Sequence, residues 1–296
     1  MIDVTTKSAD SAGDSLSAAT AMGAVTLRVA DLDTMLGYYR DGIGLELLAQ
    51  SGSDAVLGRG AVPSMILRQE SALKHASPSQ AGLYHTAFLF PEAGDLAASV
   101  YSVATKYGSS FTGSSDHLVS KALYFDDPEG NGVELYWDRP RSEWTWQGDR
   151  VAMGTVYLDP NRFLSENLTD SLAETGPVGA AGVGHVHLKV GDIPTARAFY
   201  VDTLGFEMTA EYGPQALFVS AGGYHHHVGM NTWQSAGAGQ RTPALGLGEV
   251  TIRLGSPDDL GALRERLAAK RLAVRDSGAE LAFDDPWSNL VKVVVD

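Results

Sequence analysis

Apolar and polar residues alternate over short stretches of this chain, and two of the stretches repeat one another. Residues 23–33 and 184–194 each carry an alternating run that leads into an Asp, Asp31 or Asp192, and a Gly follows each helical segment at the same distance. Alternation with a period of two predicts a strand, Asp before a helical segment acts as its N-cap, and Gly favours the helix end. Each copy is therefore predicted to begin as strand, helix, strand.

Two other stretches resemble each other at their ends. Residues 122–135 and 281–293 both contain an apolar run, an Asp-Asp-Pro turn and a second apolar run, a pattern that predicts a hairpin. These hairpins close two further modules, which begin at Gly82 and Gly248 and have predicted helices over 95–107 and 257–270. The fold class is therefore α+β, with four βαβββ modules along the chain.

The four modules fall into two halves. We expect a disordered tail over 1–20, an N-terminal domain over 21–138, a linker over 139–181 and a C-terminal domain over 182–296. In the linker, residues 160–172 form an amphipathic stretch that we expect to be a helix capped by Asp159. No apolar run is long enough to span a bilayer and no signal-peptide pattern occurs, so we expect a cytoplasmic protein without a membrane partner.

Composition narrows the possible chemistry. The formal net charge of −14 argues against a nucleic-acid partner, because binding to phosphates requires clustered Lys and Arg. The chain contains no Cys, which excludes disulfides, thiolate nucleophiles and thiolate metal ligands. Any metal must therefore be held by His, Asp or Glu. The paired acids at the two hairpin turns precede Pro, a context that favours a role in turn formation over metal binding.

A longer motif covers the second module. It consists of a small residue and His, an aliphatic-Tyr pair, Asp-Pro-x-Gly and a Glu, here Ser115, His117, Leu123, Tyr124, Asp127, Pro128, Gly130 and Glu134. With the four modules, this motif resembles the vicinal oxygen chelate (glyoxalase/bleomycin resistance/dioxygenase) superfamily, and within it the type I extradiol catechol 2,3-dioxygenases. The resemblance implies two open mixed β-barrels with outer helices. It also implies a metal held by the first strand of each of two modules and the last strand of one.

The ligand positions that the resemblance implies are not filled in every module. The first-strand position holds Ala24, His85, His185 and Glu249 in the four modules in turn, and the last-strand Glu134 is replaced by Lys292 in the fourth. Pairing the modules in order gives two incomplete sites, whereas pairing the second with the third gives His85, His185 and Glu134. We therefore infer that the middle modules share one barrel and the outer modules the other. An exchange between two subunits would satisfy the same pattern.

The resemblance implies further site residues. His226, in the run His225 to His227, matches an acid-base histidine, and a shift of one residue on a strand would give this role to a neighbour. Tyr124 matches a tyrosine that hydrogen-bonds the bound oxygen, and His117 a histidine behind it. His187 lies on the same strand face as His185 and is the alternative ligand, although its spacing to Asp192 is two residues too short.

Two His and one carboxylate leave several positions open on Fe(II), enough for a bidentate catechol and O2 together, and Mn(II) fits the same donors. The expected function is extradiol ring cleavage of a small aromatic diol with O2 by a homo-oligomer. The alternatives are another enzyme of the superfamily, a glyoxalase-like isomerase or thiol transferase, or a non-catalytic binding protein like the bleomycin-resistance proteins. A shared scaffold alone does not separate these functions.

Overall fold

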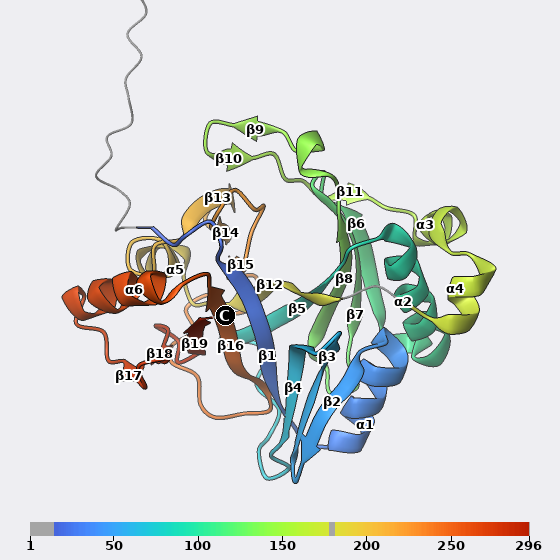
Figure 1. The fold of residues 1–296 in the computed structure, drawn as a ribbon, viewed down its shortest axis with the longest axis horizontal. Helices are drawn as coiled ribbons and strands as arrows, with labels where there is room; N and C mark the ends of the chain where they lie inside the picture. Colours follow the sequence, from blue (N-terminus) through green and yellow to red (C-terminus); the bar gives the residue numbers. More distant parts are fainter. Residues whose placement is uncertain (1–14, 178–180, 296) are drawn as a thin grey trace, which may run out of the picture.

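The computed structural model describes residues 15–177 and 181–295, and its strands form two large sheets with helices on their outer faces (Figure 1). Helices α1 to α4 lie on one side of the molecule and α5 and α6 on the other. Most of the buried apolar side chains form one continuous cluster that includes Val25, Phe88, Val186 and Val250, one residue from each module. The two sheets thus share a single core.

The predicted order of elements is present in all four modules. The first contains β1 (Ala21–Val29), α1 (Leu32–Gly37), η2 (Tyr38–Ile43), β2 (Glu46–Ser51), β3 (Asp54–Arg59) and β4 (Val62–Gln69). The second contains β5 (Gly82–Phe90), α2 (Ala93–Lys106), η3 (Gly108–Ser110), β6 (Phe111–Asp116), β7 (Ser120–Asp126) and β8 (Gly132–Asp138). The third contains β12 (Gly182–Lys189), α5 (Ile193–Tyr200), β13 (Glu207–Tyr212), β14 (Ala216–Ser220) and β15 (Val228–Asn231). The fourth contains β16 (Gly246–Leu254), α6 (Pro257–Ala269), β17 (Arg275–Asp276), β18 (Glu280–Asp284) and β19 (Leu290–Val295).

The sheets join modules from opposite halves of the chain. One sheet has the strand order β17-β18-β19-β16-β1-β4-β3-β2 and combines the first and fourth modules. The other has the order β11-β6-β7-β8-β5-β12-β15-β14-β13 and combines the second and third. At its centre, β5 and β12 run antiparallel. The pairing inferred from the ligand positions is thus confirmed, and it occurs within one chain.

Local sequence explains where the elements begin and end. The Asp31 and Asp192 side chains accept hydrogen bonds from the backbone N–H of Thr34 and Thr195, as N-caps do. Gly44 follows the first helix with φ +91°, a left-handed conformation that Gly adopts without steric cost. Both predicted caps are therefore confirmed.

The Asp-Pro turns are also built as predicted. Asp127 accepts hydrogen bonds from the backbone N–H of Glu129 and Asn131, and Asp285 accepts them from Trp287 and Asn289. The carboxylates hold the hairpin turns, because each accepts two backbone N–H groups of its own turn.

The linker differs from its prediction. Asp159 does cap a helix, but that helix, α3 (Pro160–Asn167), ends at Leu168, and a second one, α4 (Asp170–Thr175), begins after the side chain of Thr169 caps it. A Thr that caps a new helix competes with continuation of the first. The linker also contains η4 (Arg141–Glu143), β9 (Trp146–Gln147), β10 (Arg150–Val151) and β11 (Val156–Tyr157), and β11 extends the larger sheet beside β6.

The expected disordered tail needs a similar correction. Residues 1–14 lie outside the described part of the chain, but the following residues are packed. The backbone N–H of Leu16 donates a 2.8 Å hydrogen bond to the carbonyl of Gly205, and its side chain is buried. A short apolar contact and one backbone bond are enough to hold this segment on the third module.

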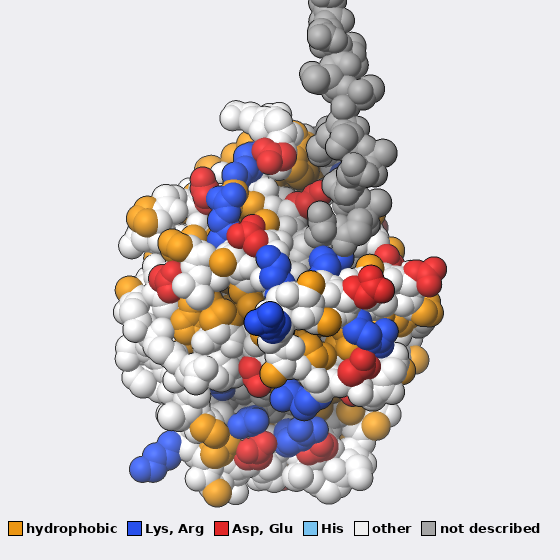
Figure 2. Space-filling model, turned by 90° about the vertical axis from the view of Figure 1, so that its left-hand side faces the viewer, with side chains coloured by type: hydrophobic (Ala, Val, Ile, Leu, Met, Phe, Trp, Pro, Cys, Tyr) orange, Lys and Arg blue, Asp and Glu red, His pale blue; other side chains and the backbone are white. Residues whose placement is uncertain are grey.

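The surface carries both signs of charge. On the face that includes α6, Figure 2 shows acidic and basic side chains mixed with apolar ones rather than gathered into a patch of one sign. Among the described residues, no helix is long and apolar enough to cross a bilayer.

Candidate metal centre

Strand register brings the three predicted ligands together. Glu134 on β8 lies beside Ala87 on β5, and Ala87 in turn lies beside His185 on β12. His85 stands two residues before Ala87 and shares its face, because side chains alternate along a strand. The small Ala87 side chain leaves open space between Glu134 and His185. The inner face of the larger sheet thus presents one carboxylate and two imidazoles around a gap.

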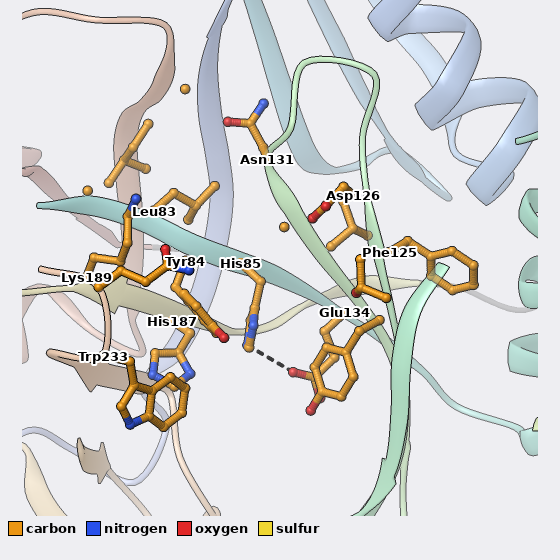
Figure 3. A pocket seen from close by; sticks show the side chains of 18 of the residues that line it. Leu83, Tyr84, His85, Phe125, Asp126, Asn131, Glu134, His187, Lys189 and Trp233 are labelled. Atoms are coloured by element: carbon orange, nitrogen blue, oxygen red, sulfur yellow. Dashed lines mark ion pairs between the residues drawn. The ribbon is translucent and has the colours of Figure 1, made fainter. Parts of the chain in front are cut away.

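The donor atoms converge closely. Nε2 of His85 lies 2.9 Å from Oε2 of Glu134, and Nε2 of His185 lies 3.1 Å from the same oxygen. All three residues are buried, and each offers a ligand atom within 4.8 Å of the others. Figure 3 shows the His85 ring directed toward Glu134. Nε2 of His85 is buried, and its close contact with Glu134 is an ion pair that lacks the angles of a hydrogen bond, as expected of a nitrogen placed for a metal.

The charge states suit a divalent cation. Burial alone would raise the pKa of Glu134, but the neighbouring His185 and His85 hold it well below its ordinary value. Burial lowers the pKa of His185 to about 4, although Glu134 opposes this shift. At neutral pH the cluster therefore offers the Glu134 carboxylate and, at His185, a neutral imidazole. Oxygen and imidazole donors of this kind fit Fe(II), Mn(II) or Zn(II), and the residues present thus fit the metal that the sequence predicts.

His187, the alternative ligand, is otherwise engaged. The side-chain oxygen of Asn231 accepts a hydrogen bond from the backbone N–H of Trp233, so the amide nitrogen of Asn231 donates the 3.0 Å hydrogen bond to Nε2 of His187. His187 follows His185 by two residues, as Ala87 follows His85. The neighbour of His187 on β15 is Gly229, whereas the neighbour of Ala87 on β8 is Glu134. The third module therefore provides no second carboxylate, and His187 lies next to the cluster rather than in it.

The outer modules hold no equivalent cluster within residues 15–177 and 181–295. Lys292 stands where the Glu would be, and its ammonium forms a 2.7 Å ion pair with Glu280. Ala24 offers no ligand atom. Among the described residues, the candidate metal centre thus lies in the sheet that the middle modules form.

Tyr124 and His117 form a hydrogen-bonded pair beside the cluster. Tyr124 lies opposite Glu134 in the β7–β8 hairpin, and its hydroxyl lies 2.6 Å from Nε2 of His117. Nδ1 of His117 lies 2.7 Å from the carbonyl of Gly154, which can only accept, so Nδ1 carries the proton. Nε2 then accepts from the Tyr124 hydroxyl. Burial, reinforced by the charge of Glu134, raises the pKa of Tyr124 well above its ordinary value and keeps it a donor.

The three consecutive histidines are not on a strand, as the sequence suggested, but in the loop before β15. His226 lines the cavity, with its ring centroid 4.0 Å from that of His185. His225 contacts Asp138 and His227 contacts Ser220 instead. Burial lowers the pKa of His226 well below its ordinary value, and the neighbouring histidines, His185 first, act in the same direction. His226 is thus a neutral imidazole facing the site.

A cavity of about 830 Å³ opens over the cluster. Its wall also contains aromatic side chains that no sequence pattern indicated, which include Tyr84, Tyr212, Phe218 and Trp233. Figure 3 shows Tyr84, His187 and Trp233 on one side of His85. Ring centroids of Tyr84 and His187 lie 5.1 Å apart, and those of Tyr84 and Trp233 lie 5.4 Å apart. No motif marks these residues, because a lone aromatic residue in a strand or turn carries no sequence signal of the direction in which its side chain points.

Known proteins match this chain over most of its length. The model of the Glyoxalase/Bleomycin resistance protein/Dioxygenase superfamily matches residues 21–135 and 182–292. Catechol-2,3-dioxygenase from Bacillus subtilis (strain 168) is 36% identical over 276 residues, which cover 91% of this chain and 95% of that protein. Biphenyl-2,3-diol 1,2-dioxygenase 2 from Rhodococcus globerulus is 38% identical over 25% of this chain and 38% of its own length.

Solved structures share the fold. A crystal structure from Bacillus subtilis matches with a TM-score of 0.63 and 15% identity over 93% of this chain and 86% of that one. Glyoxalase I from Zea mays matches with a TM-score of 0.56 and 16% identity over 93% of this chain and 92% of that one. At these identities the likeness concerns the fold alone. The family model and the Bacillus subtilis relative cover most of the chain, and the chain therefore belongs to the Glyoxalase/Bleomycin resistance protein/Dioxygenase superfamily.

Proposed function

We propose that this protein is an Fe(II)-dependent extradiol dioxygenase that opens the ring of a catechol-type diol with O2. The observation that carries the proposal is the convergence of His85, His185 and Glu134 on one gap in a buried cavity. The 36% identity to a catechol-2,3-dioxygenase over almost the whole chain supports the same reaction class.

His85, His185 and Glu134 would hold the metal. When bound, Fe(II) supplies the redox partner for O2 and the positive charge that favours a chelating diol in its anionic form. A single carboxylate among the ligands leaves the site with a net positive charge, which suits an anionic substrate.

The other side chains of the cavity would bind the diol and move its proton. The aromatic wall of Tyr84 and Trp233 offers flat apolar surface to an aromatic ring. His226 is neutral and faces the cavity, so it can accept a hydroxyl proton from the diol and return it later. The Tyr124 hydroxyl, held by His117, can hydrogen-bond an oxygen of the reactants beside Glu134.

Oxygen uptake tests the proposal. The full chain would be loaded with Fe(II) under anaerobic conditions and mixed with catechol, 3-methylcatechol, 4-methylcatechol and 2,3-dihydroxybiphenyl in an oxygen electrode. One O2 consumed per diol, with formation of a yellow ring-opened product, is the expected result. Parallel samples loaded with Mn(II) would show whether that metal also supports turnover.

Two controls sharpen the experiment. The variant Glu134→Gln is expected to lose bound metal, measured by elemental analysis, while its circular dichroism stays unchanged. Isomerisation of the methylglyoxal–glutathione adduct would be assayed in parallel, since glyoxalase I shares this fold. Absence of oxygen uptake across the diol panel by protein that retains Fe(II) would overturn the proposed function.

A further inference from the structure

A chain of hydrogen bonds runs behind His226, away from the cavity. Nδ1 of His226 lies 2.7 Å from Nδ1 of His225, and Nε2 of His225 lies 2.8 Å from Oδ1 of Asp138. We propose that His225 and Asp138 are positioning residues that fix which ring nitrogen of His226 carries the proton, so that its lone pair faces the substrate. This inference rests on the proposed function, in which His226 accepts the proton of the diol.

The proton positions follow from what each group can donate. A carboxylate oxygen accepts, so we assign the proton between Asp138 and His225 to Nε2 of His225. With that one proton on His225, its Nδ1 is the acceptor in the contact with His226. The proton in the 2.7 Å contact must then be on Nδ1 of His226. Nε2 of His226, the nitrogen left for the cavity, is consequently unprotonated and able to act as a base.

The Asp138 carboxylate, at the far end of this hydrogen-bond network, is also held in place. Oδ2 of Asp138 accepts a 2.9 Å hydrogen bond from the Tyr224 hydroxyl, whose oxygen lies 2.7 Å from the Tyr136 hydroxyl. A side chain at position 184 would collide with that Tyr136 hydroxyl, so Gly184 leaves the room it needs. Both Asp138 oxygens are thus occupied by donors, which holds the carboxylate in the orientation that His225 requires.

The linker covers the His225 part of this hydrogen-bond network, and the Asp138 side chain stays partly exposed. Trp144 packs its ring 5.3 Å from that of His225 and 5.9 Å from that of Tyr224, centroid to centroid. Its indole N–H donates to the carbonyl of Arg139, and the His225 side chain is fully buried. Water is therefore kept from His225, where it would offer a competing donor and acceptor. Neither His225 nor Asp138 lines the cavity, so both act through His226.

The direct test reads the tautomer of His226 by NMR. Full-length protein labelled with ¹⁵N-histidine would be loaded with Zn(II), which is diamagnetic, and His226 would be assigned through a His226→Gln variant. We expect the Nδ1–H form in the parent protein, a shift to the Nε2–H form or a mixture in His225→Phe and Asp138→Ala, and retention of Nδ1–H in Asp138→Asn. Asn keeps an oxygen that can accept from His225, whereas Ala does not.

Activity provides the second readout. We expect His225→Phe to lower kcat by about 10- to 100-fold with little change in KM or bound iron. The loss should shrink with 4-nitrocatechol, which ionises near neutral pH without help from a base. A role in packing alone would affect both diols equally.

His227→Phe is the matched control, because it makes the same substitution at another buried histidine, two residues from His225. His227 contacts Ser220 rather than Asp138. This variant should leave the tautomer of His226 and the kcat unchanged. An Nε2–H tautomer in the parent, or an Nδ1–H tautomer that persists in both His225→Phe and Asp138→Ala, would overturn the inference. The NMR result does not depend on turnover, so it stands apart from a failure of the diol panel, which would overturn the proposed function.

Discussion

The Tyr39 hydroxyl donates a 2.9 Å hydrogen bond to Oδ2 of Asp127, 88 residues further along the chain. Tyr200 and Asp285 repeat this contact at 3.0 Å. In each case the helical segment of one module holds the hairpin turn of the next. The sheets pair modules across the two halves, whereas these bonds tie the modules within each half. Each module is thus linked to one module of the other half and to its neighbour in the same half, which explains why the four share a core.

Removal of the Tyr39 hydroxyl should cost stability. Because Asp127 is buried, Tyr39→Phe would remove one of its donors without replacement by water, and we expect a loss of about 1–2 kcal/mol in the free energy of unfolding. Urea denaturation followed by circular dichroism would measure it. Tyr200→Phe should show a similar loss, and Tyr101→Phe, which changes an exposed ring, should show none. Equal stability of all three variants would contradict the prediction.

Asp127 should also make stability depend on pH. Burial raises its pKa from 3.8 to about 6, despite the hydrogen bonds it accepts from Asn131, Tyr39 and Glu129. A pKa that is higher in the folded state means that Asp127 contributes stability below about pH 4 and that this contribution is lost as the pH rises through about 6. Relative to Asp127→Asn, which does not titrate, the parent should lose up to about 3 kcal/mol between pH 4 and pH 7. Urea titrations at several pH values would show the opposite slope if the hydrogen bonds outweighed burial.

The small size of the Ala87 side chain should be required for metal binding. A larger side chain between Glu134 and His185 would fill the gap in which the donor atoms meet, so Ala87→Leu is expected to lose most of its bound metal. Overpacking should also destabilise the fold by about 1–3 kcal/mol. Ala55→Leu makes the same change at a fully buried position of the other sheet and should keep its metal. Full metal occupancy in Ala87→Leu, measured by elemental analysis, would place the metal elsewhere.

Tyr124 and His117 should act as one unit under the proposed function. We expect Tyr124→Phe to retain iron and to lower kcat by about 10-fold or more, because it removes a hydrogen bond at the reacting oxygens. If His117 acts only by holding that hydroxyl, the double variant Tyr124→Phe with His117→Gln should be as active as Tyr124→Phe alone. Additive losses in the double-mutant cycle would show that His117 has a separate role.

Patterns in the sequence were sufficient to predict the four modules and the candidate metal ligands. Alternation, Asp caps and Asp-Pro turns are local patterns, and the backbone satisfies them locally, so Asp31, Asp192 and Asp127 have the predicted roles. Even the pairing of the second module with the third followed from the sequence, because only that pairing completes a set of two His and one carboxylate.

Other features of the site depend on how distant segments pack together. This packing determined that His226 rather than His225 lines the cavity, that His187 is engaged by Asn231, and that Trp144 of the linker covers His225. These relations join residues that are distant in sequence or lie in a loop, where no period dictates the direction of a side chain. Their positions depend on packing and hydrogen-bond partners supplied by other elements, and the physical reason is that a short sequence pattern encodes only the conformation of its own segment.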